Sequence, residues 1–264
     1  MIRQFIFNGQ ESAEIGIIVT KIHRPILPAL RPRKLLISGK DGLWDFGNNT
    51  YEEGQIVVDC VLIEPLSKRN LIRSLALWLS TKGKISFSDE YDKYYLGRLY
   101  ESFTEVIDGS FGSFSLVFEV DPFAYSALKT TEEVLLSSEI PLGANIMLGN
   151  SEEYNIFLNT PGSFSFSNFG EQNIRPKINI TGSFGQITLA TNSKSLTFDS
   201  AITNQSLVLD GENYTAELDG INRLANLTGD IDDFLTLIPG ENVVTVSGVN
   251  LDCNIEFEFR PTFY

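Results

Sequence analysis

The stretch Cys253-Asn254-Ile255-Glu256-Phe257-Glu258-Phe259 alternates apolar and polar side chains without interruption. A period of two places the apolar side chains on one face of an extended chain, which is typical of a strand with one buried face. Similar short runs recur from residue 163 onward at intervals of roughly 8–12 residues, which predicts a β-sandwich. The expected strands are 163–166, 177–181, 186–191, 195–199, 206–210, 213–218, 241–247 and 253–259. The turns between them are expected at Pro161-Gly162, Asp210-Gly211, Asp219-Gly220 and Pro239-Gly240.

The first half of the chain adds one helix to a set of strands. After the apolar run 56–63, apolar residues recur at a spacing of three and four: Leu71, Ile72, Leu75, Trp78 and Leu79. This spacing predicts an amphipathic helix, with Ser67 as its N-cap and Gly83 as its stop. Strands are expected at 3–7, 16–22, 55–64, 84–88, 94–103 and 113–121. The first half is therefore predicted to be an antiparallel β domain with one α-helix.

The charges divide the chain at the same place. Residues 1–130 hold 15 Lys and Arg against 16 Asp and Glu, a net charge of −1. The whole chain has 20 Lys and Arg and 34 Asp and Glu, so residues 131–264 hold 5 basic and 18 acidic residues, a net charge of −13. Both tryptophans lie in the first part. We therefore predict two domains, 1–130 and 131–264, in a mainly β protein.

The composition excludes several classes of protein. One histidine and two cysteines cannot build a multi-histidine metal site or a four-thiolate zinc site. A net charge of −14 excludes a DNA-reading protein of the usual basic kind. The N-terminus lacks the apolar region of a signal peptide, and no apolar run is long enough for a membrane span. We expect a soluble chain made in a cytoplasm, with Cys60 and Cys253 as buried apolar residues and a disulfide between them as the alternative.

No residue pattern predicts catalysis. Acidic clusters occur at Glu152-Glu153, at Asp210 with Glu212, and at Asp230, Asp232 and Asp233. Such clusters are expected in the turns of so acidic a domain, although paired catalytic carboxylates or a calcium site at Asp230 and Asp232 are alternatives. His23 has no nucleophile motif beside it and is interpreted as structural. We expect no enzyme activity, no metal and no cofactor.

Two features are candidates for binding. Arg31, Arg33 and Lys34 form the only basic cluster, inside the proline-punctuated segment 21–34, which can be neither a helix nor a central strand. This segment and the loop 39–53, with Trp44, are long for a compact domain, so they are candidate contacts to a neighbouring subunit or partner. Surface loops without a partner are the alternative. Sugar binding by the second domain would depend on Tyr154, Tyr214 and Tyr264, since most of its phenylalanines fall on buried positions.

Four segments together resemble the distal tail proteins of bacteriophages with long, non-contractile tails. They are Ser38–Gly47 with the strand into Cys60; Leu77–Leu79 with Gly83, Phe87–Glu90 and Asp92–Tyr95; Asn168–Gly170 with Arg175–Gly182; and Pro239–Asn242 with the strand 243–247. Their order and spacing cover nearly the whole chain.

The resemblance implies a structural role at the tail tip of a virion. Residues 1–130 would form a homohexameric ring, single or as two rings back to back, and residues 131–264 would be a peripheral galectin-like β-sandwich. The implied partners are the tail-tube protein, a hub or fibre protein and receptor-binding proteins, with DNA passing through the ring but no sequence-specific nucleic-acid binding and no membrane insertion. Arg31, Arg33, Lys34 and Trp44 are the candidate ring or tube contacts. A carbohydrate-binding adhesion module that contacts the host cell wall is the alternative function.

Overall fold

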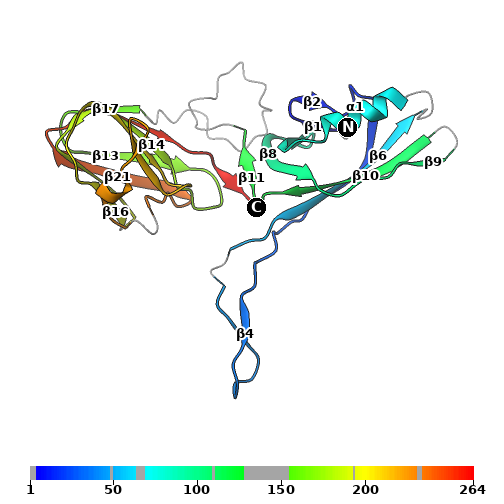
Figure 1. Cartoon of the computed structure of the whole chain (residues 1–264), viewed down its shortest axis with the longest axis horizontal. Helices are drawn as coiled ribbons and strands as arrows, with labels where there is room; N and C mark the ends of the chain where they lie inside the picture. Colours follow the sequence, from blue (N-terminus) through cyan, green and yellow to red (C-terminus); the bar gives the residue numbers. More distant parts are fainter. Residues whose placement is uncertain are drawn as a thin grey trace. The chain divides into compact units, whose positions relative to one another are not determined.

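The computed structural model describes residues 4–47, 50–63, 69–108, 111–127, 155–192, 194–230 and 234–264. The chain divides into two compact units (Figure 1). The first unit comprises residues 1–127 together with Tyr264, and the second comprises residues 128–263. The mainly β architecture expected from the alternation is confirmed, and α1 (Arg69–Trp78) is the one α-helix in the described part of the chain.

The first unit is built on an antiparallel sheet with the order β2-β1-β7-β8-β10-β6-β3. Its longest ladder joins β6 to β10 over ten residue pairs, from Gly54 opposite Val120 to Ile63 opposite Phe111. β9 pairs with β10, and β11 pairs with β8. The strands are β1 (Phe5–Phe7), β2 (Gln10–Glu11), β3 (Ile17–His23), β6 (Gly54–Ile63), β7 (Gly83–Phe87), β8 (Glu90–Leu99), β9 (Val106–Asp108), β10 (Phe111–Val120) and β11 (Ala124–Ser126).

The helix α1 closes the core of the first unit. Trp78 stacks on Phe5 with ring centroids 5.6 Å apart, and its Nε1 donates a hydrogen bond to the Phe7 carbonyl oxygen at 3.0 Å. Phe118 contacts Phe5 and Phe7, and its side chain is fully buried. The indole therefore buries its rings against β1 and still satisfies its polar N–H group.

Two helix-boundary predictions fare differently. Ser67, the predicted N-cap, lies outside the described residues. Gly83 does not end the helix, which stops at Trp78; it is the first residue of β7. A Cβ at Gly83 would overlap the Asn8 side chain, whose Oδ1 accepts a hydrogen bond from the Lys84 backbone N–H at 3.0 Å. This close approach, and not a helix cap, requires glycine at that position.

The second unit contains two antiparallel sheets. The larger has the order β12-β22-β14-β17-β18-β19, and the other has the order β13-β21-β15-β16-β20. Buried side chains of both sheets form one apolar cluster, in which Phe166 and Phe257 contact each other at 4.5 Å between centroids. The strands are β12 (Asn155–Leu158), β13 (Gly162–Asn168), β14 (Lys177–Phe184), β15 (Gln186–Thr191), β16 (Lys194–Phe198), β17 (Ile202–Asp210), β18 (Thr215–Leu218), β19 (Ile221–Asn222), β20 (Leu227–Gly229), β21 (Gly240–Val249), β22 (Asp252–Glu258) and β23 (Thr262–Phe263), with a 3₁₀-helix at Leu224–Asn226.

The turn predicted at Asp219-Gly220 joins β18 to β19. Leu218 lies opposite Ile221, and Asp219 and Gly220 have φ of 46° and 77°. Positive φ at both central residues is the geometry of a type I′ hairpin turn. The Asp219 carboxylate accepts hydrogen bonds from the Ser206 N–H at 3.0 Å and from Gln205 Nε2 at 2.9 Å.

Two aspartates in turns, Asp210 and Asp219, make the folding stability of the second unit depend on pH in the acidic range. Hydrogen bonds from Ser206 and Gln205 lower the pKa of Asp219. Burial opposes ionisation of Asp210, but hydrogen bonds from Asn213 and Glu212 outweigh it and lower the pKa of Asp210 as well. Because the unfolded chain binds these protons first, their contribution is complete above the unfolded pKa of 3.8 and is lost as pH falls through the folded values.

The melting temperature is therefore expected to fall as pH is lowered past 3.8. The double variant Asp210→Asn, Asp219→Asn should show a shallower fall, because it has lost both titrating groups. Thermal melts followed by circular dichroism, from neutral pH down to about pH 2, measure both slopes. Equal slopes in the two proteins would contradict the assignment.

The two cysteines are free thiols in separate units. Cys60 belongs to the core of the first unit and Cys253 to that of the second, and both are buried. Burial, with a smaller contribution from Asp59, raises the pKa of the Cys60 thiol to about 12. Burial and then Asp252 raise the pKa of Cys253. The thiolate, which is the reactive form, is therefore scarce near neutral pH.

Iodoacetamide at mildly alkaline pH is expected to leave Cys60 and Cys253 unmodified in the folded protein and to alkylate both in guanidinium chloride. Mass spectrometry of the intact chain gives the number of labels. Labelling of Cys60 in the folded protein at the rate of a free thiol would mean that the central strand β6 opens readily.

Candidate interaction site: an apolar arm

An extended segment leaves the sheet of the first unit between β3 and β6 (Figure 1). These two strands are neighbours and pair antiparallel, from Ile17 opposite Leu62 to His23 opposite Val57. The thirty residues between them, 24–53, form what we call the arm; residues 48 and 49 are outside the described part. Its tip is a two-stranded hairpin of β4 (Lys34–Leu36) and β5 (Leu43–Asp45).

Short backbone contacts hold the two limbs of the arm together. The Arg31 N–H donates to the Thr50 carbonyl at 2.7 Å, and the Glu52 N–H donates to the Ala29 carbonyl at 2.7 Å. Pro25, Pro28 and Pro32 lack donors, so a regular ladder cannot form along this limb. The arm is therefore an open, extended ribbon below its tip and a hairpin only at the end. The sequence interpretation correctly excluded a helix here but missed the two short strands.

The tip turn is made by residues 37–42. The Lys40 N–H donates to the Ile37 carbonyl at 3.1 Å, and Gly39 and Gly42 have φ of 81° and 77°. Gly39 and Gly42 therefore take backbone conformations that other residues rarely adopt.

The root of the arm is fixed by charge and by aromatic rings. Arg24 forms ion pairs with Asp89 and, at 3.2 Å, with Glu90, and its guanidinium lies 4.9 Å from the centroid of the Phe87 ring. On the returning limb, the rings of Tyr51, Phe123 and Tyr264 contact one another edge to face, and the Tyr51 and Tyr264 hydroxyls are 3.2 Å apart. The hydrogen bond with Tyr264 raises the pKa of Tyr51.

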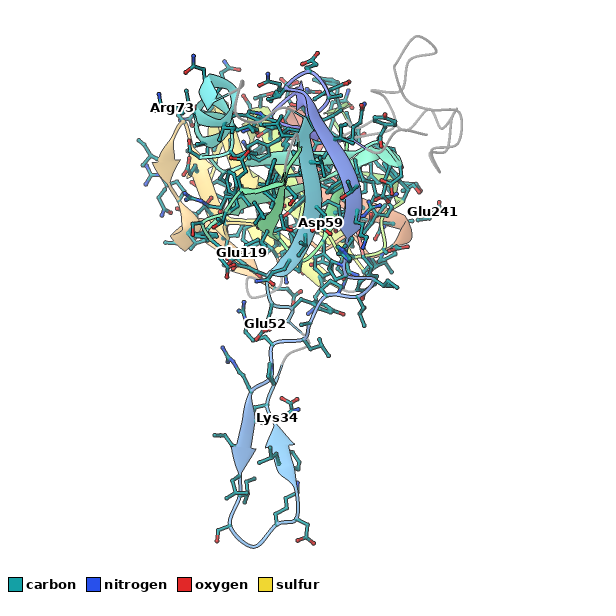
Figure 2. The ribbon with its side chains drawn as sticks, turned by 90° about the vertical axis from the view of Figure 1, so that its right-hand side faces the viewer. Lys34, Glu52, Asp59, Arg73, Glu119 and Glu241 are labelled. Atoms are coloured by element: carbon teal, nitrogen blue, oxygen red, sulfur yellow. The ribbon has the colours of Figure 1, made fainter. Side chains whose placement is uncertain are left out.

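Both faces of the arm tip present apolar side chains to solvent. Leu35 lies opposite Trp44 and shares a face with Phe46, with exposures of 61%, 46% and 50%. On the other face, Leu36 lies opposite Leu43, with exposures of 79% and 58%. Figure 2 shows Lys34 on this hairpin, well away from Asp59 and Glu119 in the sheet of the same unit.

The exposed apolar area is concentrated on the arm. Of the 21 large hydrophobic residues that are exposed in the described part of the chain, nine lie between residues 26 and 46. They are Ile26, Leu27, Leu30, Leu35, Leu36, Ile37, Leu43, Trp44 and Phe46. A two-stranded hairpin with no buried face is at best marginally stable in water, and a contiguous exposed apolar patch marks an interaction site.

The four predicted contact residues all lie on this arm and are exposed. Arg31, Arg33 and Lys34 have no ion pair within the described residues; their backbones, by contrast, hold the ribbon. Arg33 donates its N–H to Asp45 Oδ1 at 3.3 Å and accepts from the Phe46 N–H at 2.8 Å. The three side-chain charges are therefore available to a partner, because no ion pair within the described residues neutralises them.

The sequence reasoning missed two features of the site. It singled out the basic cluster and Trp44, but not the apolar residues 35–37, 43 and 46 around them. It also missed Lys40, whose Nζ lies 3.5 Å from the centroid of the Trp44 ring. A cation at this distance is attracted to the indole face, so it holds the exposed ring in place.

The described residues offer no assembled catalytic set. His23 Nε2 lies 3.3 Å from Asp59 Oδ2, and Ser115 Oγ donates to Asp59 Oδ1 at 2.6 Å. Asp59 therefore stands between the other two, so His23 cannot take a proton from Ser115 as a base does from a nucleophile. The hydrogen bond from Ser115, followed by that from His23, lowers the pKa of Asp59. This cluster stabilises the ladder of β3, β6 and β10.

The described ranges contain neither a cluster of metal ligands nor a helix that could span a membrane. No group of three or more His, Cys, Asp or Glu residues there is placed to hold a metal ion. Asp232, needed for the suggested calcium site, and the pair Glu152-Glu153 lie outside those ranges. No helix in them has the length and hydrophobicity of a membrane span.

Comparisons with known proteins point to phage tails. Residues 10–120 match the family described as phage tail protein RIFT-related domain. No curated protein matches the chain. The crystal structure of the Dit protein (gp 19.1) of phage SPP1, described as a paradigm of hub adsorption apparatus in phages infecting Gram-positive bacteria, is similar over 98% of this chain and 99% of that chain, with 19% identity and a TM-score of 0.65. A chain of the phage p2 baseplate in its activated conformation with Sr aligns over 98% of this chain and 98% of that chain, with 9% identity and a TM-score of 0.43.

The match over residues 10–120 includes β3, the whole arm, β6, α1 and the strands up to β10. The similarity to SPP1 Dit extends the shared fold over both units. The resemblance to distal tail proteins, predicted from the sequence, is thus confirmed by the family domain and by the fold.

Proposed function

Starting from the phage tail RIFT-related domain in residues 10–120, we propose that this chain is a structural protein of the distal tail tip of a phage virion. It would be made in the cytoplasm of the bacterial host. It acts by assembly and not by catalysis, and its first unit provides the contacts. The observation that carries the proposal is the apolar arm, whose tip has two exposed apolar faces.

A second copy of the chain is the partner that best fits the arm. An arm that seats on a different surface of the next copy makes a head-to-tail contact, and such contacts close into a ring when the rotation is suitable. The first 130 residues have a net charge of −1, so copies of this part can pack closely. Residues 131–264 have a net charge of −13 and repel one another, which favours their placement at the periphery.

The number of subunits and the neighbours follow from the resemblance. We propose a ring of six copies, as one ring or as two back to back, joined to a tail-tube protein on one side and to a hub or fibre protein on the other. DNA would pass through the opening during ejection. Because the cations of the arm are expected at subunit contacts, the opening should carry few unpaired cations that could retain phosphate.

Native mass spectrometry of the full chain tests the assembly. A ring of six copies should have six times the chain mass of 29.4 kDa, and paired rings should have twice the mass of one ring. Negative-stain images should show an annulus with an open centre. A single compact particle of one chain mass at every concentration, with no annulus formed on addition of a tail-tube protein, would overturn it.

Deletion of residues 31–34 tests the role of the arm more locally. The ring should be lost, because the shortened limb can no longer pair Arg31 with Thr50 or present Lys34 opposite Asp45. Unchanged ring and tube attachment after this deletion would make the arm a surface loop without a partner.

A further inference from the structure

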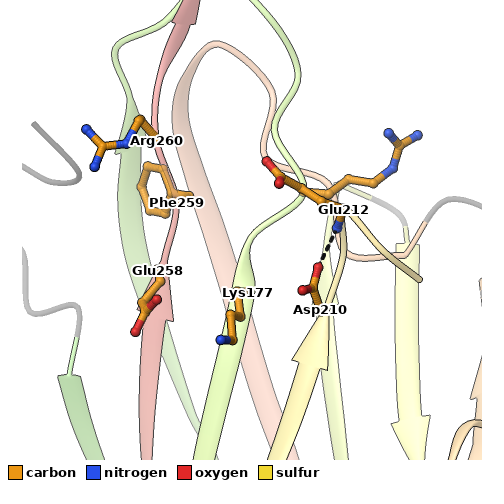
Figure 3. A pocket seen from close by; sticks show the side chains of 7 residues that line it. Lys177, Asp210, Glu212, Glu258, Phe259 and Arg260 are labelled. Carbon is orange, nitrogen blue, oxygen red and sulfur yellow. Dashed lines mark hydrogen bonds between the residues drawn. The ribbon is translucent and has the colours of Figure 1, made fainter. Parts of the chain in front are cut away.

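One end of the larger sheet in the second unit contains a pocket of about 180 Å³ (Figure 3). It is lined by Arg175, Lys177, Asp210, Glu212, Glu258, Phe259 and Arg260. Strand register explains why these residues meet. Lys177, at the start of β14, lies opposite Glu258 of β22 on one side and opposite Asp210 of β17 on the other.

The cations in this pocket are unusually concentrated. Residues 131–264 contain only five basic residues against 18 acidic ones, and three of the five line this pocket. With Asp210, Glu212 and Glu258 they bring its formal charge to zero. A pocket with no net formal charge is a local exception within residues 131–264, whose net charge is −13.

Two of the three pocket carboxylates, those of Asp210 and Glu258, already accept hydrogen bonds from neighbouring residues. Asp210 accepts hydrogen bonds from the Glu212 N–H at 3.0 Å and from the Asn213 N–H and Nδ2 at 2.9 and 2.8 Å. Glu258 Oε1 accepts from Asn179 Nδ2 at 3.1 Å. These bonds fix both side chains as parts of the pocket wall.

Lys177 and Glu212 are exposed, and their side chains make no hydrogen bond among the described residues, although the Lys177 charge contributes to the lowered pKa of Asp210. The Lys177 ammonium has no ion pair within 4.0 Å there, and the Glu212 carboxylate accepts no hydrogen bond there. Desolvation at the pocket wall, and then the Asp210 carboxylate, raise the pKa of Glu212. The pocket therefore presents an ammonium with three donors and a carboxylate with open acceptor positions.

We propose that this pocket binds one ring of a neutral saccharide. A sugar hydroxyl both donates and accepts hydrogen bonds, so adjacent hydroxyls can accept from Lys177 and donate to Glu212. The buried Phe259 ring provides an apolar wall. The volume is below that of drug-sized ligand sites, which limits the ligand to about a single ring.

The charges favour a neutral ligand over an anion. A phosphate or carboxylate would be attracted by the three cations but repelled by the three carboxylates that line the same pocket. Of the tyrosines that the sequence suggested for sugar binding, the two in the described residues, Tyr214 and Tyr264, do not line the pocket. Tyr214 is covered by the Arg175 guanidinium at 5.3 Å, Tyr264 belongs to the first unit, and Tyr154 is outside the described residues.

Saturation-transfer NMR on the full chain, with glucose, galactose and N-acetylglucosamine as separate probes at millimolar concentration, tests the proposal. At least one sugar should receive saturation from the protein. The variants Lys177→Met and Glu212→Ala should each weaken binding by about 10-fold, since each removes a hydrogen bond to a charged group. Lys194→Met, the same change on β16 and outside the pocket, is the matched control and should bind as the parent does.

Three outcomes would overturn the saccharide site: no transfer to any of the sugars, transfer that persists in both pocket variants, or displacement of the sugar by inorganic phosphate with tighter phosphate binding in Glu212→Ala. Circular dichroism spectra of the variants exclude loss of the fold as the cause of lost binding. The arm is intact in every variant, so ring formation by native mass spectrometry is read separately. Failure of the pocket leaves the tail-tip proposal standing, and the reverse also holds.

Discussion

Replacing Leu35, Trp44 and Phe46 together by serine is expected to convert the assembled protein into monomers. The three side chains share one face of the arm tip, with exposures between 46% and 61%. In an assembly that face would be buried, and each large apolar side chain contributes about 1.5–3 kcal/mol when it is removed from water. Losing three of them weakens each contact by several orders of magnitude. Sedimentation velocity across a range of concentrations measures the change.

The matched control is Leu77→Ser, which removes a leucine that is 78% exposed on α1, outside the arm. It should assemble as the parent does. The triple variant should melt at the parent's monomer temperature, since none of the three side chains belongs to the core of the first unit. An assembly of unchanged mass in the triple variant would show that this face of the arm is not a subunit contact.

Phe118→Ala is expected to destabilise the first unit by about 3–5 kcal/mol. Phe118 is fully buried on β10 and contacts Phe5 and Phe7, which in turn hold Trp78 of the helix. Truncation leaves a cavity at the place where the sheet and α1 meet. Differential scanning calorimetry should show the transition of the first unit moved down by roughly 10–20 °C, with the second unit's transition unchanged.

Phe157→Ala is the control for this prediction. The same side chain is removed, but Phe157 lies on β12 in the second unit and is 64% exposed. Its effect should stay within about 0.5 kcal/mol. If both variants shift the same transition, or if Phe118→Ala costs no more than the control, the core of the first unit is not centred on β1, β10 and α1.

Eight strands of the second unit were predictable because alternation marks a buried face, whereas β12, β19, β20 and β23 were not expected from the sequence. The run 186–191 coincides with β15, and the expected strands 177–181 and 253–259 lie on β14 and β22. Alternation fails as a signal where neither face is buried. The arm tip therefore reads as a loop in the sequence, although Leu35 and Trp44 lie opposite each other in a hairpin.

The candidate sites depend on contacts that no local pattern encodes. The root of the arm brings Tyr51 next to Tyr264, which is 213 residues away in the sequence. The pocket of the second unit takes Lys177, Glu258 and Asp210 from three strands, and only their register makes them neighbours. The sequence analysis placed Asp210 and Glu212 in a turn, and Asp210 does accept hydrogen bonds within that turn. The sequence does not show that Arg175, Lys177 and Arg260 line the same pocket.

The positions of the two tryptophans give this chain a pair of internal optical probes. Trp78 is stacked on Phe5 in the core, whereas Trp44 is on the arm, half exposed beneath Lys40. With Trp44→Phe, the remaining indole emission follows unfolding of the first unit alone. With Trp78→Phe, the emission of the remaining Trp44 follows the change in solvent exposure of the arm as copies associate. One fluorimeter can therefore separate the folding equilibrium from the association equilibrium without any added dye.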